Sequence, residues 1–167
     1  MPSAPDIPPA DRGDYETVIA GYTAAGADET VQRVVTALSR VHKQLDGFYR
    51  AQLADLELHR GDWSVLQALA LQGPTGCLTP SRLADQTGVS PSTMTHRLDL
   101  LAERGLIERA IDEENRTRSK VKLTKAGRSL FERAVLEADL VESAALDPLR
   151  PSERRALADL LEKLLKS

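Results

Sequence analysis

TPSRLADQTGVSPSTMTHRLDLLAERG, residues 79–105, contains two helix starts of the same form. Thr79 and Ser90 each precede a proline, which places an N-cap hydroxyl directly before a residue that is well tolerated at the first helical position. The apolar residues behind them stop at glycines, Gly88 in the first helix and Gly105 in the second. The spacing predicts two short helices joined by a glycine-containing turn, which is the helix-turn-helix arrangement.

The periodicity changes after the second helix. Residues 106–111 and 119–123 are short and β-prone, and in the second run apolar residues alternate with polar ones. A polar loop over residues 112–116 separates the two runs. We therefore expect a two-stranded hairpin, a β-wing, directly after the helix-turn-helix.

Longer amphipathic helices are predicted on both sides of this region. The fold class is mainly α: a winged helix-turn-helix over residues 59–128, flanked by an N-terminal dimerisation helix over 28–58 and C-terminal dimerisation helices over 129–167. Residues 1–27 are rich in Pro, Ala and Gly and are expected to be a flexible N-terminal arm, in which 14–22 could form one or two helical turns.

Three residues are predicted to set helix ends around the central region. Gly61 is expected to end the long N-terminal helix, and Asp62 to cap the helix that follows it. Thr124 is expected to cap the long helix after the hairpin.

The terminal helices have more apolar surface than one small winged domain can cover. An exposed apolar stripe of that length is a liability unless a partner covers it, so we expect a homodimer. The alternative is a monomer whose terminal helices fold back on the same chain.

Basic residues are concentrated at and after the hairpin. The formal net charge of the chain is −3, but residues 115–128 contain six Lys or Arg and no acidic residue. A local basic element in an acidic protein favours a targeted polyanion contact, and a helix with an adjacent hairpin can enter a DNA groove and reach the neighbouring phosphates. The expected contacts to double-stranded DNA are Ser90, Ser92, Thr93, Thr95, His96 and Arg97 on the second helix, and Asn115, Arg116, Arg118 and Lys120 on the hairpin. The alternative is a winged helix that binds another protein.

The hairpin sequence resembles a known family. Gly105-Leu106-Ile107-Glu108-Arg109, then Asp112 and Arg116, then Leu123-Thr124-Lys125-Ala126-Gly127, is similar to the wing of MarR-type transcriptional regulators. Residues 92–101 are similar to the recognition helix of that family. The resemblance covers about residues 28–165, and two positions depart from the family pattern: Asn115 replaces a frequent Asp, and Thr117 a frequent Arg.

The resemblance implies a homodimer with interlocked terminal helices that binds a pseudo-palindromic operator and usually represses nearby genes. It implies that Arg116 is the wing arginine and that Asp112 orients it. It also implies a small-molecule effector that releases the DNA. The candidate effector contacts, which could hold a small aromatic carboxylate or phenol, are His42, Tyr49, Arg50, His59 and Trp63. Trp63 could instead belong to the core, His42 to an interface and His59 to a helix end.

Composition and the absence of certain motifs argue against membrane, secreted and enzymatic functions. The chain is 41% hydrophobic and has no long apolar run or secretory signal, so we expect a cytoplasmic protein that does not contact membranes. No catalytic triad order, phosphate-binding glycine loop or metal-ligand spacing is present, so we expect no enzyme, cofactor or metal. A redox-sensing role for the single cysteine, Cys77, is a further alternative, weighed against a bystander thiol.

Overall fold

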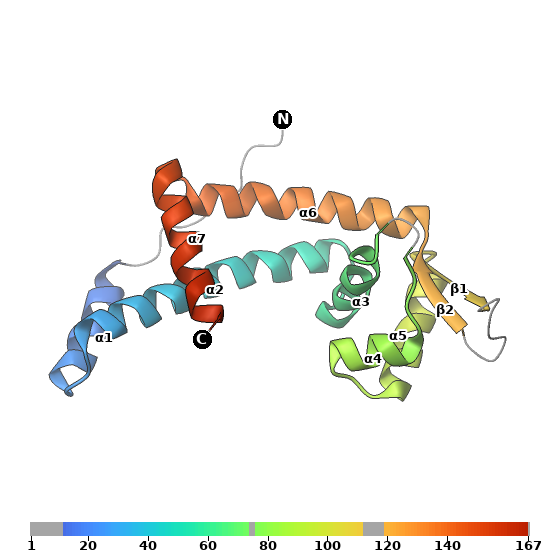
Figure 1. The fold of residues 1–167 in the computed structure, drawn as a ribbon, viewed down its shortest axis with the longest axis horizontal. Helices are drawn as coiled ribbons and strands as arrows, with labels where there is room; N and C mark the ends of the chain where they lie inside the picture. Colours follow the sequence, from blue (N-terminus) through green and yellow to red (C-terminus); the bar gives the residue numbers. More distant parts are fainter. Residues whose placement is uncertain (1–11, 74–75, 112–118, 167) are drawn as a thin grey trace. The chain divides into compact units, whose positions relative to one another are not determined.

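A computed structural model describes residues 12–73, 76–111 and 119–166 (Figure 1). The described elements are α1 (Arg12–Ala24), α2 (Glu29–Asp55), α3 (Arg60–Ala70), α4 (Pro80–Thr87), α5 (Pro91–Glu103), β1 (Ile107–Ile111), β2 (Ser119–Leu123), α6 (Lys125–Leu146) and α7 (Pro151–Leu165). Two compact units are present: residues 49–136 form one, and the residues before and after that range form the other. Within the described residues, no helix is long and apolar enough to cross a membrane.

The 49–136 unit contains the buried core of the winged helix. Its apolar side chains come from every element between the end of α2 and the start of α6, and the fully buried ones include Val65, Leu66, Leu69, Leu83, Met94, Leu98, Leu101 and Val121. This core fixes the inner faces of α3, α4 and α5, so their remaining faces point to solvent.

Local capping chemistry sets the two short helices, as predicted. The Thr79 hydroxyl accepts a hydrogen bond from the Arg82 amide at 3.3 Å, and the Ser90 hydroxyl accepts one from the Thr93 amide at 3.2 Å. Gly88 ends α4 in the left-handed conformation, φ 66°. The mainly helical fold with a small wing is confirmed.

The wing is an antiparallel pair, and its register runs from Ile107 opposite Leu123 to Ile111 opposite Ser119. One addition was not predicted: Leu78 pairs with Val121, and the two residues exchange amide-to-carbonyl hydrogen bonds of 2.8 and 3.0 Å. The single bridge lies before α4 in sequence, so it joins the wing to the start of the helix-turn-helix.

The junction between α2 and α3 differs from the prediction. Gly61 does not end the long helix, because it lies inside α3. Glu57 ends it instead, with a left-handed φ of 53°, and the Leu58 amide donates to the Leu53 carbonyl oxygen at 2.8 Å. This is the hydrogen-bond pattern of a Schellman motif, here with a glutamate where glycine is usual. Asp62 is the third residue of α3, and its carboxylate accepts a hydrogen bond from the His59 amide at 3.0 Å.

The start of α6 packs closely on the end of α5. The Thr124 hydroxyl donates to the Gly105 carbonyl oxygen at 2.7 Å and accepts from the Gly127 amide at 3.0 Å, which confirms the predicted cap. A Cβ at Gly127 would lie far inside contact distance of the Leu106 carbonyl oxygen. Glycine is therefore required here because the two backbones approach too closely for a side chain.

The other unit contains α1, most of α2, the end of α6, and α7. Residues 12–24 are helical, so the predicted flexible arm is wrong for this part of 1–27, and the helix is longer than the one or two turns considered. The Tyr15 hydroxyl donates to the Arg33 carbonyl oxygen at 2.9 Å, and the Arg40 guanidinium pairs with the Asp14 carboxylate at 2.8 Å. These contacts with α2 stabilise the α1 helix, which its own sequence favours only weakly.

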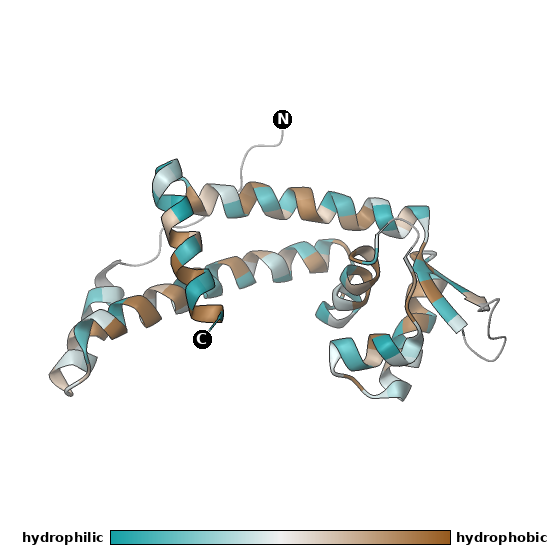
Figure 2. Ribbon diagram, in the orientation of Figure 1, coloured by the Kyte–Doolittle hydropathy of each residue, from teal (hydrophilic) through white to brown (hydrophobic). Residues whose placement is uncertain are grey.

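Apolar side chains remain exposed along the helices of this unit. Figure 2 shows the hydrophobic residues recurring along α2, α6 and α7. Those with exposed side chains include Val31, Val34, Val35, Leu38, Val41, Leu140, Leu157, Leu160 and Leu165. No residue of α7 is buried within the chain.

Candidate nucleic-acid interface

The exposed face of α5 presents small polar residues. Met94, Leu98 and Leu101 fill the core, so the opposite side of the helix faces solvent. Four of the predicted DNA contacts lie there and are exposed: Ser92, Thr93, Thr95 and His96. This face can hydrogen-bond to base edges or phosphates, because hydroxyls and an imidazole both donate and accept.

Hydroxyl groups are clustered at the start of α5. The Ser90 hydroxyl lies 3.0 Å from that of Ser92 and 2.8 Å from that of Thr93, while the Thr95 hydroxyl donates to the Pro91 carbonyl oxygen at 2.9 Å. Ser90 therefore serves mainly as the helix cap. The amides of a helix start carry partial positive charge and form a suitable site for a phosphate.

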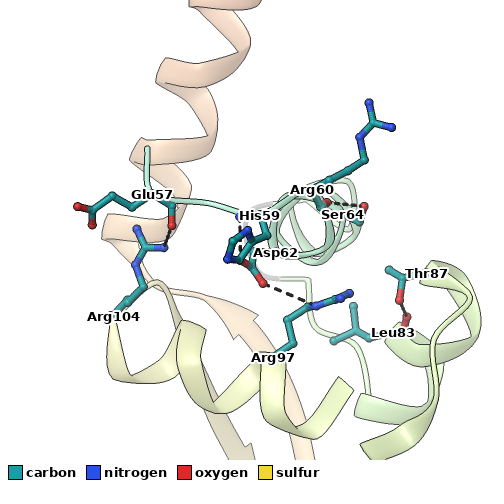
Figure 3. A network of polar contacts seen from close by, with 9 residues as sticks. All are labelled: Glu57, His59, Arg60, Asp62, Ser64, Leu83, Thr87, Arg97 and Arg104. Atoms are coloured by element: carbon teal, nitrogen blue, oxygen red, sulfur yellow. Dashed lines mark hydrogen bonds and ion pairs between the residues drawn. The ribbon is translucent and has the colours of Figure 1, made fainter. Parts of the chain in front are cut away.

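Arg97 does not join this face. Its Nε lies 3.7 Å from an Asp62 carboxylate oxygen, and only 21% of its side chain is exposed (Figure 3). The guanidinium occupies the space where a Cβ of Gly61 would lie, so glycine at that position admits it. The structure turns Arg97 toward α3, and we remove it from the expected DNA contacts.

Asp62 combines two roles at the start of α3. It is the one charged or polar residue among the described positions that is buried, with 8% exposed. Its carboxylate caps the His59 amide, and the Asp62 amide donates to the His59 carbonyl oxygen at 3.0 Å. A carboxylate is stabilised at a helix N-terminus, and the nearby Arg97 guanidinium adds opposite charge.

The wing contacts α5 through Arg109. The Arg109 guanidinium lies 2.7 Å from an Asp99 carboxylate oxygen and donates to the Thr95 carbonyl oxygen at 3.3 Å. Lys122 pairs with Glu108 across the strands at 3.0 Å, and Lys120 lies half-buried on β2. The remaining predicted wing residues, Asp112, Asn115, Arg116 and Arg118, lie outside the described residues.

A cavity lies beside the junction of α2 and α3. Its volume is about 480 Å³, and it is lined by Arg50, Leu53, Ala54, Glu57, Leu58, His59 and Arg60. Two predicted effector contacts, Arg50 and His59, are brought together there. A third basic residue, Arg60, also lines the cavity but was not among the predicted effector contacts. Its position directly after His59 could have indicated it.

The other effector candidates lie elsewhere. Trp63 stacks on Phe131 with ring centroids 5.1 Å apart and packs against the core. Tyr49 is half-buried near the end of α2 and does not line the cavity. His42 belongs to the other compact unit. Cys77 is half-buried, and the described residues hold no cluster of metal-ligating side chains.

Comparisons with known proteins agree with this geometry. The MarR family model matches residues 55–116. The HTH-type transcriptional regulator PecS of Dickeya dadantii (strain 3937) is 29% identical over 133 residues, which are 80% of each chain.

Two solved structures extend the similarity to the fold. A cysteine-to-serine mutant of MarR from E. coli has a TM-score of 0.64 and 25% identity, over 78% of this chain and 94% of that one. Bordetella bronchiseptica BpsR, whose DNA binding is regulated by 6-hydroxynicotinic acid, has a TM-score of 0.60 and 25% identity, over 85% of this chain and 99% of that one.

A helix-turn-helix followed by paired strands, with a polar outward face on its second helix, defines a DNA-binding protein of the winged-helix class. Within that class, the chain is similar to MarR-type transcriptional regulators: the MarR family model matches residues 55–116, PecS shares its sequence pattern, and the MarR structure shares its fold.

Proposed function

We propose that the protein is a homodimeric repressor that binds a pseudo-palindromic operator and is released by a small aromatic anion. The main support is the outward face of α5, which exposes Ser92, Thr93, Thr95 and His96, while the apolar residues on the opposite face of the helix are buried. In this proposal the α5 face lies in the major groove, and the wing residues Asn115, Arg116, Arg118 and Lys120 contact the minor groove or phosphates, with Asp112 orienting Arg116.

The dimer is supported by the apolar residues left exposed on α2, α6 and α7. Leu160 is 63% exposed and Leu165 is 86% exposed within the chain. Two copies related by a two-fold axis would cover the same stripe on each other, and would present two α5 helices to successive major grooves about 34–36 Å apart.

The effector class is supported by the cavity at the α2–α3 junction. Basic side chains of Arg50, His59 and Arg60 line it together with apolar Leu53 and Leu58. A carboxylate would pair with the basic groups while an aromatic ring covers the leucines. The similarity to BpsR, regulated by 6-hydroxynicotinic acid, is consistent with this class.

DNA binding is tested by fluorescence anisotropy with labelled duplex from the region upstream of the protein's own gene. We expect saturable binding that exceeds binding to random DNA and weakens steeply with salt, because each neutralised phosphate adds about 0.9 to the slope of log K against log salt. Arg116→Ala should weaken binding by about 1–3 kcal/mol. No binding to either DNA at low salt would favour a protein-binding winged helix.

The dimer is tested by light scattering behind size-exclusion chromatography. We expect twice the chain mass for the wild-type protein. We expect a smaller mass for Leu160→Asp, because the aspartate would place a charge in the apolar interface. Glu162→Gln, an exposed change on the same helix, is the control. A wild-type monomer at micromolar concentration would refute the dimer.

The effector site is tested by titrating the DNA complex with 6-hydroxynicotinate and with its uncharged amide. We expect release by the acid alone, and a weaker response in Arg50→Gln than in Arg155→Gln, which removes the same charge from exposed α7. Equal responses to acid and amide, or an unchanged Arg50→Gln variant, would refute an anion site in this cavity.

A further inference from the structure

Arg104 connects the end of α5 to the end of α2. Its guanidinium donates to the Glu57 carbonyl oxygen at 2.6 Å (Figure 3). It also donates to the Leu56 carbonyl oxygen at 3.0 Å. Both acceptors are backbone atoms 47 and 48 residues away in sequence. The contact lies wholly within the 49–136 unit. Arg104 is not among the residues expected to contact DNA or an effector.

The acceptor side of this contact is a well-defined backbone turn. The Glu57 amide donates to the Ala54 carbonyl oxygen at 2.9 Å, and the Leu58 amide to the Leu53 carbonyl oxygen at 2.8 Å. Glu57 has a left-handed φ of 53°, a conformation that a glutamate keeps only where its surroundings impose it. The carbonyls beyond the end of a helix carry partial negative charge, so a planar guanidinium that donates to two of them is strongly oriented.

Arg104 lies far from the part of α5 that we expect to touch DNA. Twelve residues separate it from Ser92, which is roughly 18 Å along a helix. Its two terminal nitrogens already donate to Leu56 and Glu57. We therefore expect Arg104 to affect DNA binding through the placement of α5, and the test below separates this effect from a direct phosphate contact.

We propose that Arg104 is a positioning residue for sequence-specific DNA binding, because it holds the recognition helix α5 in place against the end of α2. This inference rests on the proposed operator-binding role of α5. Hydrogen bonds to base edges require an accurately placed helix, whereas attraction to phosphates tolerates displacement. Loss of Arg104 should therefore weaken specific binding more than non-specific binding.

The test compares Arg104→Gln and Arg104→Lys with the wild-type protein. The specific probe is a labelled duplex that the wild-type protein enriches from a random library, and the non-specific probe is a scrambled duplex of equal length. Anisotropy is measured for both probes at four salt concentrations. Circular dichroism and thermal melting show whether each variant is folded, and Arg155→Gln on α7 controls for the lost charge.

The expected result for Arg104→Gln is a loss of about tenfold in affinity for the specific probe, with affinity for the scrambled probe within twofold of wild type and an unchanged salt slope. Arg104→Lys keeps the charge but lacks the two-pronged planar donor, so it should show a smaller loss of the same kind. Arg155→Gln should leave the affinity ratio unchanged.

Three results would overturn the inference. Equal losses on both probes with a shallower salt slope would make Arg104 a direct phosphate contact. A lower melting temperature with unchanged affinity for both probes would make it a structural residue only. If the wild-type protein enriches no duplex, the operator-binding role itself fails, and the inference fails with it.

Discussion

Replacement of Gly127 by alanine tests the close approach between α6 and the end of α5. A Cβ there would collide with the Leu106 carbonyl oxygen, a backbone atom that cannot rotate away. The start of α6 must then move from the turn at residues 105–106. That movement disrupts the Thr124 amide bond to Leu106, 3.1 Å, and the Thr124 hydroxyl bond to Gly105, 2.7 Å.

The expected change in unfolding free energy follows from these contacts. Two weakened hydrogen bonds lose about 1 kcal/mol each, and forced overpacking of a close contact adds about 1–3 kcal/mol. The higher helix propensity of alanine offsets about 1 kcal/mol. The net destabilisation is about 3 kcal/mol, which corresponds to a fall in Tm of roughly 6–12 °C for a chain of this size.

The assay is thermal unfolding followed by circular dichroism at fixed protein concentration, with Gly21→Ala as the matched control. Gly21 lies inside α1, and a Cβ there meets no described atom within 4 Å. Alanine at that position should raise the Tm slightly, since it gains helix propensity without a collision. A Tm for Gly127→Ala within about 2 °C of the wild type would refute the close contact.

Three further predictions concern contacts in the two units. Glu57→Gly should stabilise the fold by about 0.5–1 kcal/mol in urea denaturation, because glycine relieves the left-handed strain but gains freedom in the unfolded chain. Asp62→Asn should destabilise it by about 1–2 kcal/mol by leaving the half-buried Arg97 guanidinium without its carboxylate, and a double-mutant cycle with Arg97→Gln should recover part of that loss. A hydrogen bond from the exposed Arg150 side chain lowers the pKa of Glu153, so an NMR titration should place that pKa below its ordinary value and Arg150→Gln should return it toward normal. The stabilisation from this pair is present above the unfolded-state pKa of Glu153 and is lost as pH falls through the lowered folded-state pKa.

Much of the winged helix was predictable because its start and stop rules are local. Thr79 and Ser90 cap the helices that follow them and Gly88 ends α4, each through a hydrogen bond to a residue three or four positions away. Thr124 caps α6 by the same chemistry. Met94, Leu98 and Leu101 recur at helical spacing along α5 and are all buried, but the outward position expected for Arg97 was wrong.

The orientations of individual arginines were not predictable in the same way. Arg97 lies on α5 and Arg104 is its C-cap, yet the first turns to the Asp62 carboxylate and the second to the carbonyls of Leu56 and Glu57. A long flexible cation can reach several partners, and which one it meets depends on segments more than thirty residues away.

Local sequence patterns specify the class of fold, because helix caps, helix breakers and hydrophobic periods act over one to four residues and do not depend on distant segments. Only the folded structure shows that Trp63 stacks on Phe131, that Leu78 pairs with β2 of the wing, and that Arg50 and His59 line one cavity. No local sequence pattern predicts which of these segments come into contact. The contacts exist only after burial of the shared apolar core brings the elements together.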